Sequence, residues 1–363
     1  MSTTTAAPAA RPMTNSLAAG RLPRFSPIFL LIGSWIVMGA VYGMLAAAGT
    51  LEGFDIVGTV FFGTVLFDVA LFVWSLVVEG GRRARDRLIT SLVCTAFVIA
   101  LLPLISLIWT VVAGGVHRFD LTFFSSSMRN VLDEGGGALH ATVGTLEITG
   151  FAALISVPIG LLTAIYLVEY GRGWLAKGIT FLVDVMTGIP SIVAGLFAFA
   201  LFSLFAGPGI RAGVMGSVAL AVLMIPIVVR SAEEILKLVP NELREASYAL
   251  GVPKWLTVVK VVLPTAVAGI TTGIVLSISR VIGETAPLLL TAGFTASMNY
   301  DLFDERMMTL PVFVYTQYAN QGPEASDFIN RAWAGALELI LIVAVLNILA
   351  RLVSFFFSPK TGR

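Results

Sequence analysis

The chain has 363 residues, of which 57% are hydrophobic and only 12% are charged, about half the charged fraction of an ordinary soluble domain. A soluble fold of this length would need a polar surface that this composition cannot supply, and a net charge of +1 argues against a basic nucleic-acid surface. The single cysteine, Cys94, excludes a disulfide framework, and His117 and His140 are too few for a histidine-rich metal site.

The N-terminal part of the chain changes composition near residue 27. Residues 1–26 are rich in Ala, Thr, Pro and Arg without hydrophobic periodicity, which predicts a disordered tail. Pro27–Gly49 and Val57–Val78 are then apolar runs of the length that crosses a bilayer. The first run is too long for a secretory signal core and a second follows at once, so we predict a retained accessory transmembrane hairpin over residues 27–88.

Six further apolar runs follow, each closed by turn residues or charges. Together with the hairpin they predict an all-α polytopic membrane protein of about eight transmembrane helices, with the main transmembrane domain over residues 89–357 and a short cytoplasmic tail over 358–363. The six runs are Ile89–Ala113, Leu139–Val168, Ile179–Ala206, Met215–Arg230, Leu263–Gly293 and Trp333–Phe357.

Positive charge alternates between the loops. Lys and Arg collect before the first span, between spans two and three, between four and five, between six and seven, and after the last span. The loops on the opposite side are poor in positive charge: Thr50–Ile56 has none and Gly207–Val214 has only Arg211. Since cytoplasmic loops are enriched in Lys and Arg, we predict a multi-pass plasma membrane protein with both termini in the cytoplasm.

Two segments predicted to be external are long, Gly114–Ala138 and Phe294–Arg331. The second mixes acidic residues with aromatic ones. That mixture suits a docking surface for an external partner, and an ordinary ordered loop explains it equally well.

The loop over residues 231–262, between spans six and seven, is predicted to form a helix, a sharp break and a second helix. Pro240 is suited to the first turn of a short helix, where its missing N–H is not needed. Gly251 can adopt the left-handed conformation that ends a helix, and Pro253 prevents continuation. We expect the second helix to run from Lys254 to the start of the seventh span.

This loop resembles the EAA loop of ABC-importer permeases. Glu245-Ala246-Ser247 is followed by three residues, Gly251, nine residues and Val261-Val262-Leu263-Pro264. The one departure is Ser247, where the family pattern has a second alanine. In that family the loop is the coupling helix that sits in a groove of the ATP-binding subunit. The resemblance therefore assigns the coupling role to Glu245, Ala246, Ser247, Gly251, Leu263 and Pro264.

Neighbouring motifs are similar to those of PstA-type phosphate permeases, across residues 139–357. The resemblance implies a MetI-like permease core with the accessory hairpin added to the six-helix form, and inorganic phosphate as cargo. It also implies a PstC-like second permease, a dimer of cytoplasmic ATP-binding subunits and an external phosphate-binding protein, without a cofactor. The motifs are Asp184–Gly195, Arg230–Glu234, Leu238–Ala246, Arg280–Pro287 and Met308–Val312.

Several ionisable residues lie within the predicted spans, where each charge costs about 2.5–3.5 kcal/mol on insertion scales unless it has a partner, water or a function. Arg280 and Glu284 lie one turn apart, and form either part of an anion pathway or a structural pair. Arg230 ends the sixth span, and either contributes to the pathway or extends to the membrane boundary. An arginine can offer an oxyanion two parallel hydrogen bonds.

A second polar group surrounds the sequence from Gly188 to Ser191, where Asp184, Thr187 and Ser191 lie on nearby turns. We add these three to the pathway hypothesis. Acids within spans nevertheless outnumber arginines, so charge alone does not identify an anion as the cargo. The acids are Asp68, Glu147, Asp184 and Glu338.

No lysine follows the glycine spacing of a P-loop. We therefore predict a non-catalytic permease subunit whose ATP hydrolysis takes place on a partner. The alternatives are a permease for another oxyanion such as sulfate or molybdate, a secondary transporter, and an intramembrane protease. A secondary transporter would be expected to show inverted repeats, and a protease a recognisable catalytic motif; the sequence has no clear example of either.

Overall fold

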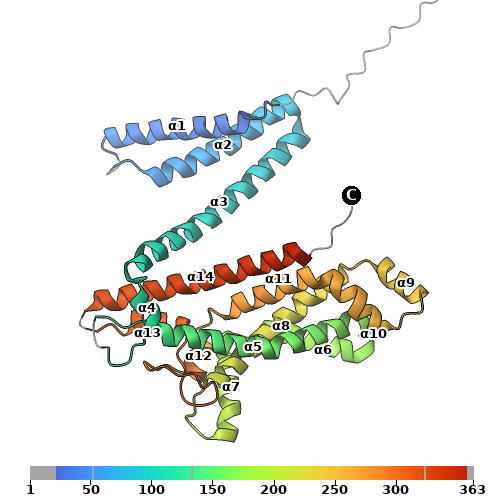
Figure 1. Cartoon of the computed structure of the whole chain (residues 1–363). Helices are drawn as coiled ribbons and strands as arrows, with labels where there is room; N and C mark the ends of the chain where they lie inside the picture. The colour runs from blue at the N-terminus through green and yellow to red at the C-terminus, as the bar shows by residue number, and fades with distance from the viewer. Residues whose placement is uncertain (1–21, 51–52, 132–133, 323, 358–363) are drawn as a thin grey trace, which may run out of the picture. The chain divides into compact units, whose positions relative to one another are not determined.

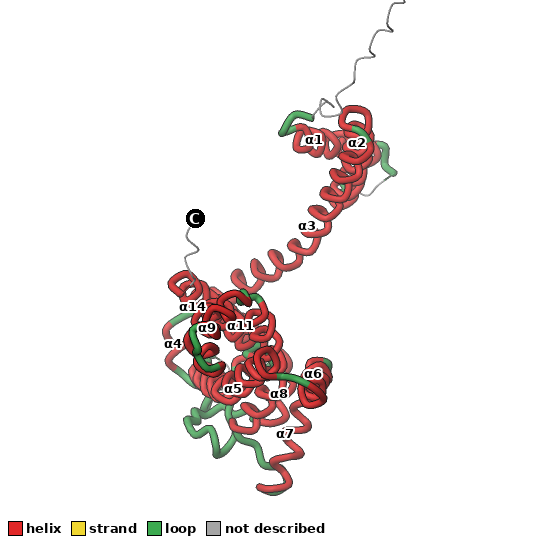
Figure 2. Tube along the Cα trace, turned by 90° about the vertical axis from the view of Figure 1, so that its right-hand side faces the viewer, coloured by secondary structure: helices red, strands yellow, loops and turns green. Residues whose placement is uncertain are grey.

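The computed structural model describes residues 22–50, 53–131, 134–322 and 324–357. Within these residues every regular element is a helix (Figure 2). Seven helices of the described chain are long and apolar enough to cross a membrane, and an eighth crossing results if the bent pair α6 (Gly173–Thr187) and α7 (Ser191–Ala206) is one span. The prediction of an all-helical polytopic protein is confirmed. Of the predicted tails, residues 1–21 and 358–363 lie outside the described residues.

The chain folds as two compact units that divide after Leu107, within α3 (Gly81–Gly115). In the first unit α1 (Ser26–Ala47) and α2 (Ile56–Glu79) pack as a hairpin (Figure 1). Gly63 permits this close packing, since a Cβ there would lie 2.5 Å from Cδ1 of Trp35. The boundary after residue 88 remains a prediction about which helices form the permease domain.

Two buried acids of the first unit, Asp68 and Glu79, have hydrogen-bond partners. The carboxylate of Glu79 accepts hydrogen bonds from the backbone N–H of Leu22 at 2.9 Å, from Ser75 Oγ at 2.8 Å and from Arg87 Nη2 at 2.9 Å. Ser91 donates to Asp68. These partners explain how the hairpin can hold acids within apolar helices.

Four long helices form the framework of the second unit, and they pack in the order α5–α8–α11–α14. Small residues allow this packing, as is common between membrane helices: a Cβ on Gly160 of α5 would lie 2.7 Å from Val228 of α8, and one on Gly273 of α11 would lie 2.7 Å from Ser231. The four helices are α5 (Leu139–Ile165), α8 (Gly213–Lys237), α11 (Leu263–Val281) and α14 (Ala325–Phe357).

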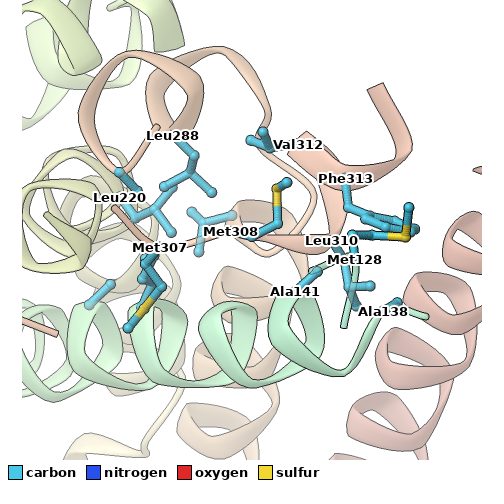
Figure 3. Close-up of a cluster of buried hydrophobic side chains, with 14 of the residues drawn as sticks. Met128, Ala138, Ala141, Leu220, Leu288, Met307, Met308, Leu310, Val312 and Phe313 are labelled. Atoms are coloured by element: carbon cyan, nitrogen blue, oxygen red, sulfur yellow. The ribbon is translucent and has the colours of Figure 1, made fainter. Parts of the chain in front are cut away.

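Part of the long segment over residues 294–331 folds into the core. Met307, Met308, Leu310 and Phe313 are buried, and Figure 3 shows them beside the α5 end at Ala141. Residues 307–309 lead into α13 (Leu310–Ala319), and the first turn of that helix is buried. The other aromatic residues remain exposed, namely Tyr300, Phe303, Tyr315 and Tyr318.

Two predicted spans are broken. The fifth, predicted as Ile179–Ala206, bends by 108° between α6 and α7, where Pro190 has no N–H to continue the helix. The seventh, predicted as Leu263–Gly293, ends at Val281 and is followed by the short α12 (Ala286–Thr291).

The helix predicted from Lys254 is present, and α11 begins at Leu263, the residue predicted to start the seventh span. The helix runs without interruption from Lys254 to Val281, through α10 (Lys254–Thr257), the π-helical turn η4 (Val258–Val262) and α11. Pro264 is the second residue after that turn. A π turn shifts the hydrogen-bond register, which explains how a proline fits inside a continuous helix.

Candidate functional site

The predicted helix–break–helix is present at one end of the second unit. Its first helix is α9 (Asn241–Ala249), with Pro240 as the N-cap, one position outside the helix where we expected it to begin. Gly251 has φ +76°, the left-handed conformation predicted for it. No atom lies within 4 Å of where its Cβ would be, so the backbone conformation alone favours glycine here.

The two helices are tied across the break by a buried pair of hydroxyl groups. Ser247 Oγ of α9 lies 2.8 Å from Thr257 Oγ1 of α10. Both side chains are buried. The residue at which this loop departs from the EAA pattern therefore helps to fix the angle between its helices.

Arg244 anchors α9 to the bundle. Its Nη2 and Nε lie 2.8 and 3.0 Å from Oε1 of Glu169, and it also donates to the carbonyl oxygens of Leu236 at 3.0 Å and Val239 at 2.6 Å. Glu169 belongs to the π-helical turn η3 (Tyr166–Tyr170) that extends α5. α9 is thus fixed to two long helices at once.

Lys254 adds a second contact to the same turn. Its ammonium group donates to the backbone oxygen of Glu169 and lies 4.9 Å from the centroid of the Tyr170 ring. Arg244, Glu169 and Lys254 were not among the site residues predicted from the sequence. The sequence offered one indication of their importance, because Arg244 is a charged residue directly before the Glu245-Ala246-Ser247 motif.

The other side of α9 faces outward. Glu245 and Ala246 are exposed, and Leu250 is 84% exposed. Leu238 and Trp255, which flank α9, are also exposed. These exposed residues, Leu238, Ala246, Leu250 and Trp255 together with Glu245, are called the coupling surface below, after the role that the resemblance to the EAA loop predicts.

The predicted coupling residues do not all belong to this surface. Glu245, Ala246, Ser247 and Gly251 come together in and directly after α9. Leu263 instead packs against the buried cluster that includes Leu236. Pro264 lies beyond the π-helical turn.

The predicted pathway residues form two separate groups. In the first, Arg230 of α8 pairs with Asp184 of α6, and its Nη1 lies 2.9 Å from Oε2 of Glu233. Thr187 Oγ1 donates within α6 to the carbonyl of Val183 at 2.8 Å, and Ser191 begins α7 beyond the bend. Arg230 is therefore held by two carboxylates.

The second group is the pair of Arg280 and Glu284, with Nη1 2.6 Å from Oε1. The Arg280 side chain is 66% exposed, whereas Glu284 is 13% exposed. Within the described chain no ion pair joins this group to Arg230 or Asp184. Arg280 therefore keeps an accessible face even while paired.

The structure is therefore that of a polytopic membrane protein with an anchored helix–break–helix between two of its long apolar helices. The family model "Binding-protein-dependent transport system inner membrane component" matches residues 156–363. The phosphate transport system permease protein PstA 1 of Mycobacterium tuberculosis (strain ATCC 25618 / H37Rv) is 48% identical over 278 residues, 76% of this chain and 89% of the relative. The chain belongs to this family of transport permeases, and within it to the PstA group.

Two further comparisons agree. The PstA protein of Yersinia pestis is 39% identical over 276 residues, which are 76% of this chain and 92% of that protein. A chain in the crystal structure of a bacterial alginate ABC transporter in complex with an alginate pentasaccharide-bound periplasmic protein has a TM-score of 0.56 at 14% identity, over 77% of this chain and 97% of its own. At 14% identity, the similarity to the alginate transporter chain shows a shared fold and nothing further.

These comparisons confirm the predicted family, the MetI-like permease fold and the role of a non-catalytic permease subunit. Membership of the family also decides against a secondary transporter and an intramembrane protease. The chain is a multi-pass membrane component of an ABC importer, a class whose members work with an ATP-binding subunit and a binding protein.

Proposed function

We propose that this chain is the permease subunit of an ATP-driven importer of inorganic phosphate in the plasma membrane, with both termini in the cytoplasm. Identity of 48% to a PstA protein over 76% of the chain supports the cargo. The loops rich in Lys and Arg support the orientation. The observation that carries the coupling role is α9 itself, because one side is anchored through Arg244 and the other carries the exposed coupling surface.

The coupling surface receives a cytoplasmic dimer of ATP-binding subunits, a PstC-like permease completes the pathway, and an external phosphate-binding protein delivers the substrate. ATP binding moves α9. The Arg244–Glu169 contact passes that movement to α5, and the hydrogen bonds from Arg244 to Leu236 and Val239 pass it to the end of α8. This is a rigid-body switch between two access states, driven by contacts that differ between them.

The pathway role of the two polar groups is part of the proposal. The exposed guanidinium of Arg280 exchanges Glu284 for a phosphate oxygen as the ion passes, and Arg230 does the same with Asp184. Thr187 and Ser191 offer hydroxyl groups at the bend. The pairing of each arginine with a carboxylate supports this, because it keeps the cation compensated when no substrate is present.

Replacement of Glu245 or Gly251 tests the coupling role. In Glu245→Ala and Gly251→Val we expect assembly with the ATP-binding subunits, ATP-dependent uptake, or both, to fall by about tenfold or more, which corresponds to roughly 1.4 kcal/mol. Glu234→Ala is the matched control, since Glu234 is exposed on α8 outside the coupling surface. Wild-type assembly and uptake in both variants would remove the assignment.

The cargo is tested separately, in vesicles that contain the complete transporter. Uptake of phosphate is compared with uptake of sulfate and molybdate at the same concentration, with the matching binding protein. We expect ATP-dependent uptake of phosphate. Uptake of sulfate or molybdate without phosphate would keep the architecture and replace the substrate.

A further inference from the structure

A polar hollow of about 370 Å³ lies at the end of the second unit that is remote from α9. Its lining includes Arg211, Thr295, Glu305 and Arg306. Arg211 precedes α8, whose 25 residues separate the hollow from the coupling helix, a length of about 37 Å at 1.5 Å per residue. Neither the coupling surface nor the two pathway groups extend to this site.

The two arginines converge on one backbone position. Gly293 has φ +74°, and a Cβ there would lie 3.0 Å from Cδ of Arg211 and 3.5 Å from Cδ of Arg306. The stems of both side chains therefore flank the same residue, and both line the hollow. Neither guanidinium forms an ion pair with any residue that the structure describes, which leaves two cations available to an anion.

The loop that carries Arg306 is held in place. The backbone N–H of Met307 donates to the carbonyl of Ala292 at 3.1 Å, and that of Val214 donates to the carbonyl of Leu302 at 2.7 Å. These bonds join the loop to the ends of α12 and α8. The hollow is therefore built from fixed backbone.

Glu305 places a carboxylate in the lining of the hollow, together with the two arginines. Its φ of +59° lies in the left-handed region, which is uncommon for a residue with a side chain. An ionised carboxylate accepts hydrogen bonds and donates none. It repels a sulfate dianion, but it can accept a hydrogen bond from phosphate, because phosphate keeps a proton at neutral pH.

We propose that this hollow is an oxyanion site at the outer end of the permease, which receives phosphate before it enters the pathway. Arg211 and Arg306 bind phosphate oxygens, and Glu305 accepts the P–OH hydrogen bond and disfavours sulfate. The inference rests on the proposed function, in which phosphate is the cargo and this end faces outward.

The test uses Thr295→Cys in a Cys94→Ala background, within the complete transporter in vesicles, with the permease's outer face accessible. Labelling rates are measured for an anionic and a cationic methanethiosulfonate, both membrane-impermeant. We expect the anionic reagent to be favoured, and each of Arg211→Gln and Arg306→Gln to lower the anionic-to-cationic rate ratio by roughly threefold. Asn320→Cys, exposed beyond α13, is the control site whose ratio should not respond to these changes.

Competition identifies the ligand. Phosphate should slow labelling of Thr295→Cys and sulfate should not, whereas Glu305→Gln should make the two anions equally protective. The site is overturned if neither arginine substitution changes the anionic-to-cationic labelling ratio, or if phosphate does not slow the labelling. If the vesicles still take up phosphate in that case, the proposed function stands. Protection by sulfate alone, together with sulfate uptake, would overturn both.

Discussion

Arg244 on the coupling helix contacts Glu169 at the end of α5, with Nη2 2.8 Å and Nε 3.0 Å from the same carboxylate oxygen. Their side chains are 11% and 4% exposed. In so buried a pair, loss of one partner leaves an uncompensated charge and typically costs about 3–5 kcal/mol. The contact is therefore a stiff connection between the coupling surface and the bundle.

Arg244→Met should loosen α9 and reduce ATP-dependent uptake more strongly than ATP hydrolysis. Hydrogen exchange of the α9 amides, uptake and ATPase rate are measured on the assembled transporter. Arg172→Met is the control, because Arg172 is exposed next to the same turn. Combining Arg244→Met with Glu169→Met should restore part of the exchange protection, since no charge is then left unpaired; unchanged exchange in Arg244→Met would contradict the anchoring role.

Ser247→Ala should be mild. It removes the hydroxyl pair with Thr257, which contributes about 1 kcal/mol, while alanine matches the EAA pattern. We expect a small fall in the melting temperature with uptake retained. In a double-mutant cycle with Thr257→Val the two losses should not add, and full additivity would show that the two hydroxyl groups are not coupled.

Gly195→Ala should destabilise the contact between α7 and α12. A Cβ there would lie 2.6 Å from Cα of Pro287, a backbone atom that cannot turn aside, and such overpacking costs about 1–3 kcal/mol. Gly150→Ala is the matched change in α5, since nothing lies within 4 Å of its Cβ position. Thermal melting in detergent should separate the two variants, and equal melting temperatures would contradict the close approach.

Thr145→Val should weaken the attachment of α13 to α5. Thr145 Oγ1 accepts a hydrogen bond from the backbone N–H of Leu310 at 2.7 Å. Valine keeps the shape but leaves that buried N–H without its partner, at a cost of about 1–3 kcal/mol. Ser203→Ala is the control, because the Ser203 hydroxyl donates only within its own helix, to Phe199; similar melting temperatures for both variants would rule out the effect.

Asp120 should make the stability of the folded protein depend on pH. Burial tends to raise its pKa, but the hydrogen bond from the Phe123 N–H and the nearby Arg118 guanidinium outweigh it and hold the pKa below its ordinary value. Its contribution to stability is therefore full above the unfolded-state pKa of about 3.9 and disappears as the pH falls through the lower folded value. When the pH falls from about 6 to about 3, the melting temperature of Asp120→Asn should decrease less than that of the wild type. Equal decreases in the two proteins would contradict this.

Local patterns predicted the features that depend on local chemistry. The length of the apolar runs predicted the membrane spans. Gly251 and Pro253 predicted the break after α9, because a left-handed backbone conformation and a missing proline N–H act within a few residues. The pairs Arg244–Glu169 and Arg230–Asp184 join residues 75 and 46 positions apart. No periodicity reports such separations, so these partners could not be predicted.

The core position of residues 307–313 illustrates a different limit. Met307, Met308 and Leu310 are apolar, but they follow a run of acidic and aromatic residues that is typical of a loop. The apolar stretch over residues 307–313 is also too short to be recognised as a membrane span. They are buried because they belong to one cluster with residues of α5, α8 and α12, which come together only in the folded chain.

The insertion of residues 307–313 among helices made much earlier has a consequence for biogenesis. The ribosome completes α5 and α8 well before it reaches Met307. Both helices therefore enter the bilayer before residues 307–313 are available to pack against them. Final assembly of the core therefore waits for the last part of the chain. A nascent chain that stops before Met307 would contain α5, α8 and α11 but would lack both residues 307–313 and α14, so its core would remain incompletely packed and open to quality-control proteases.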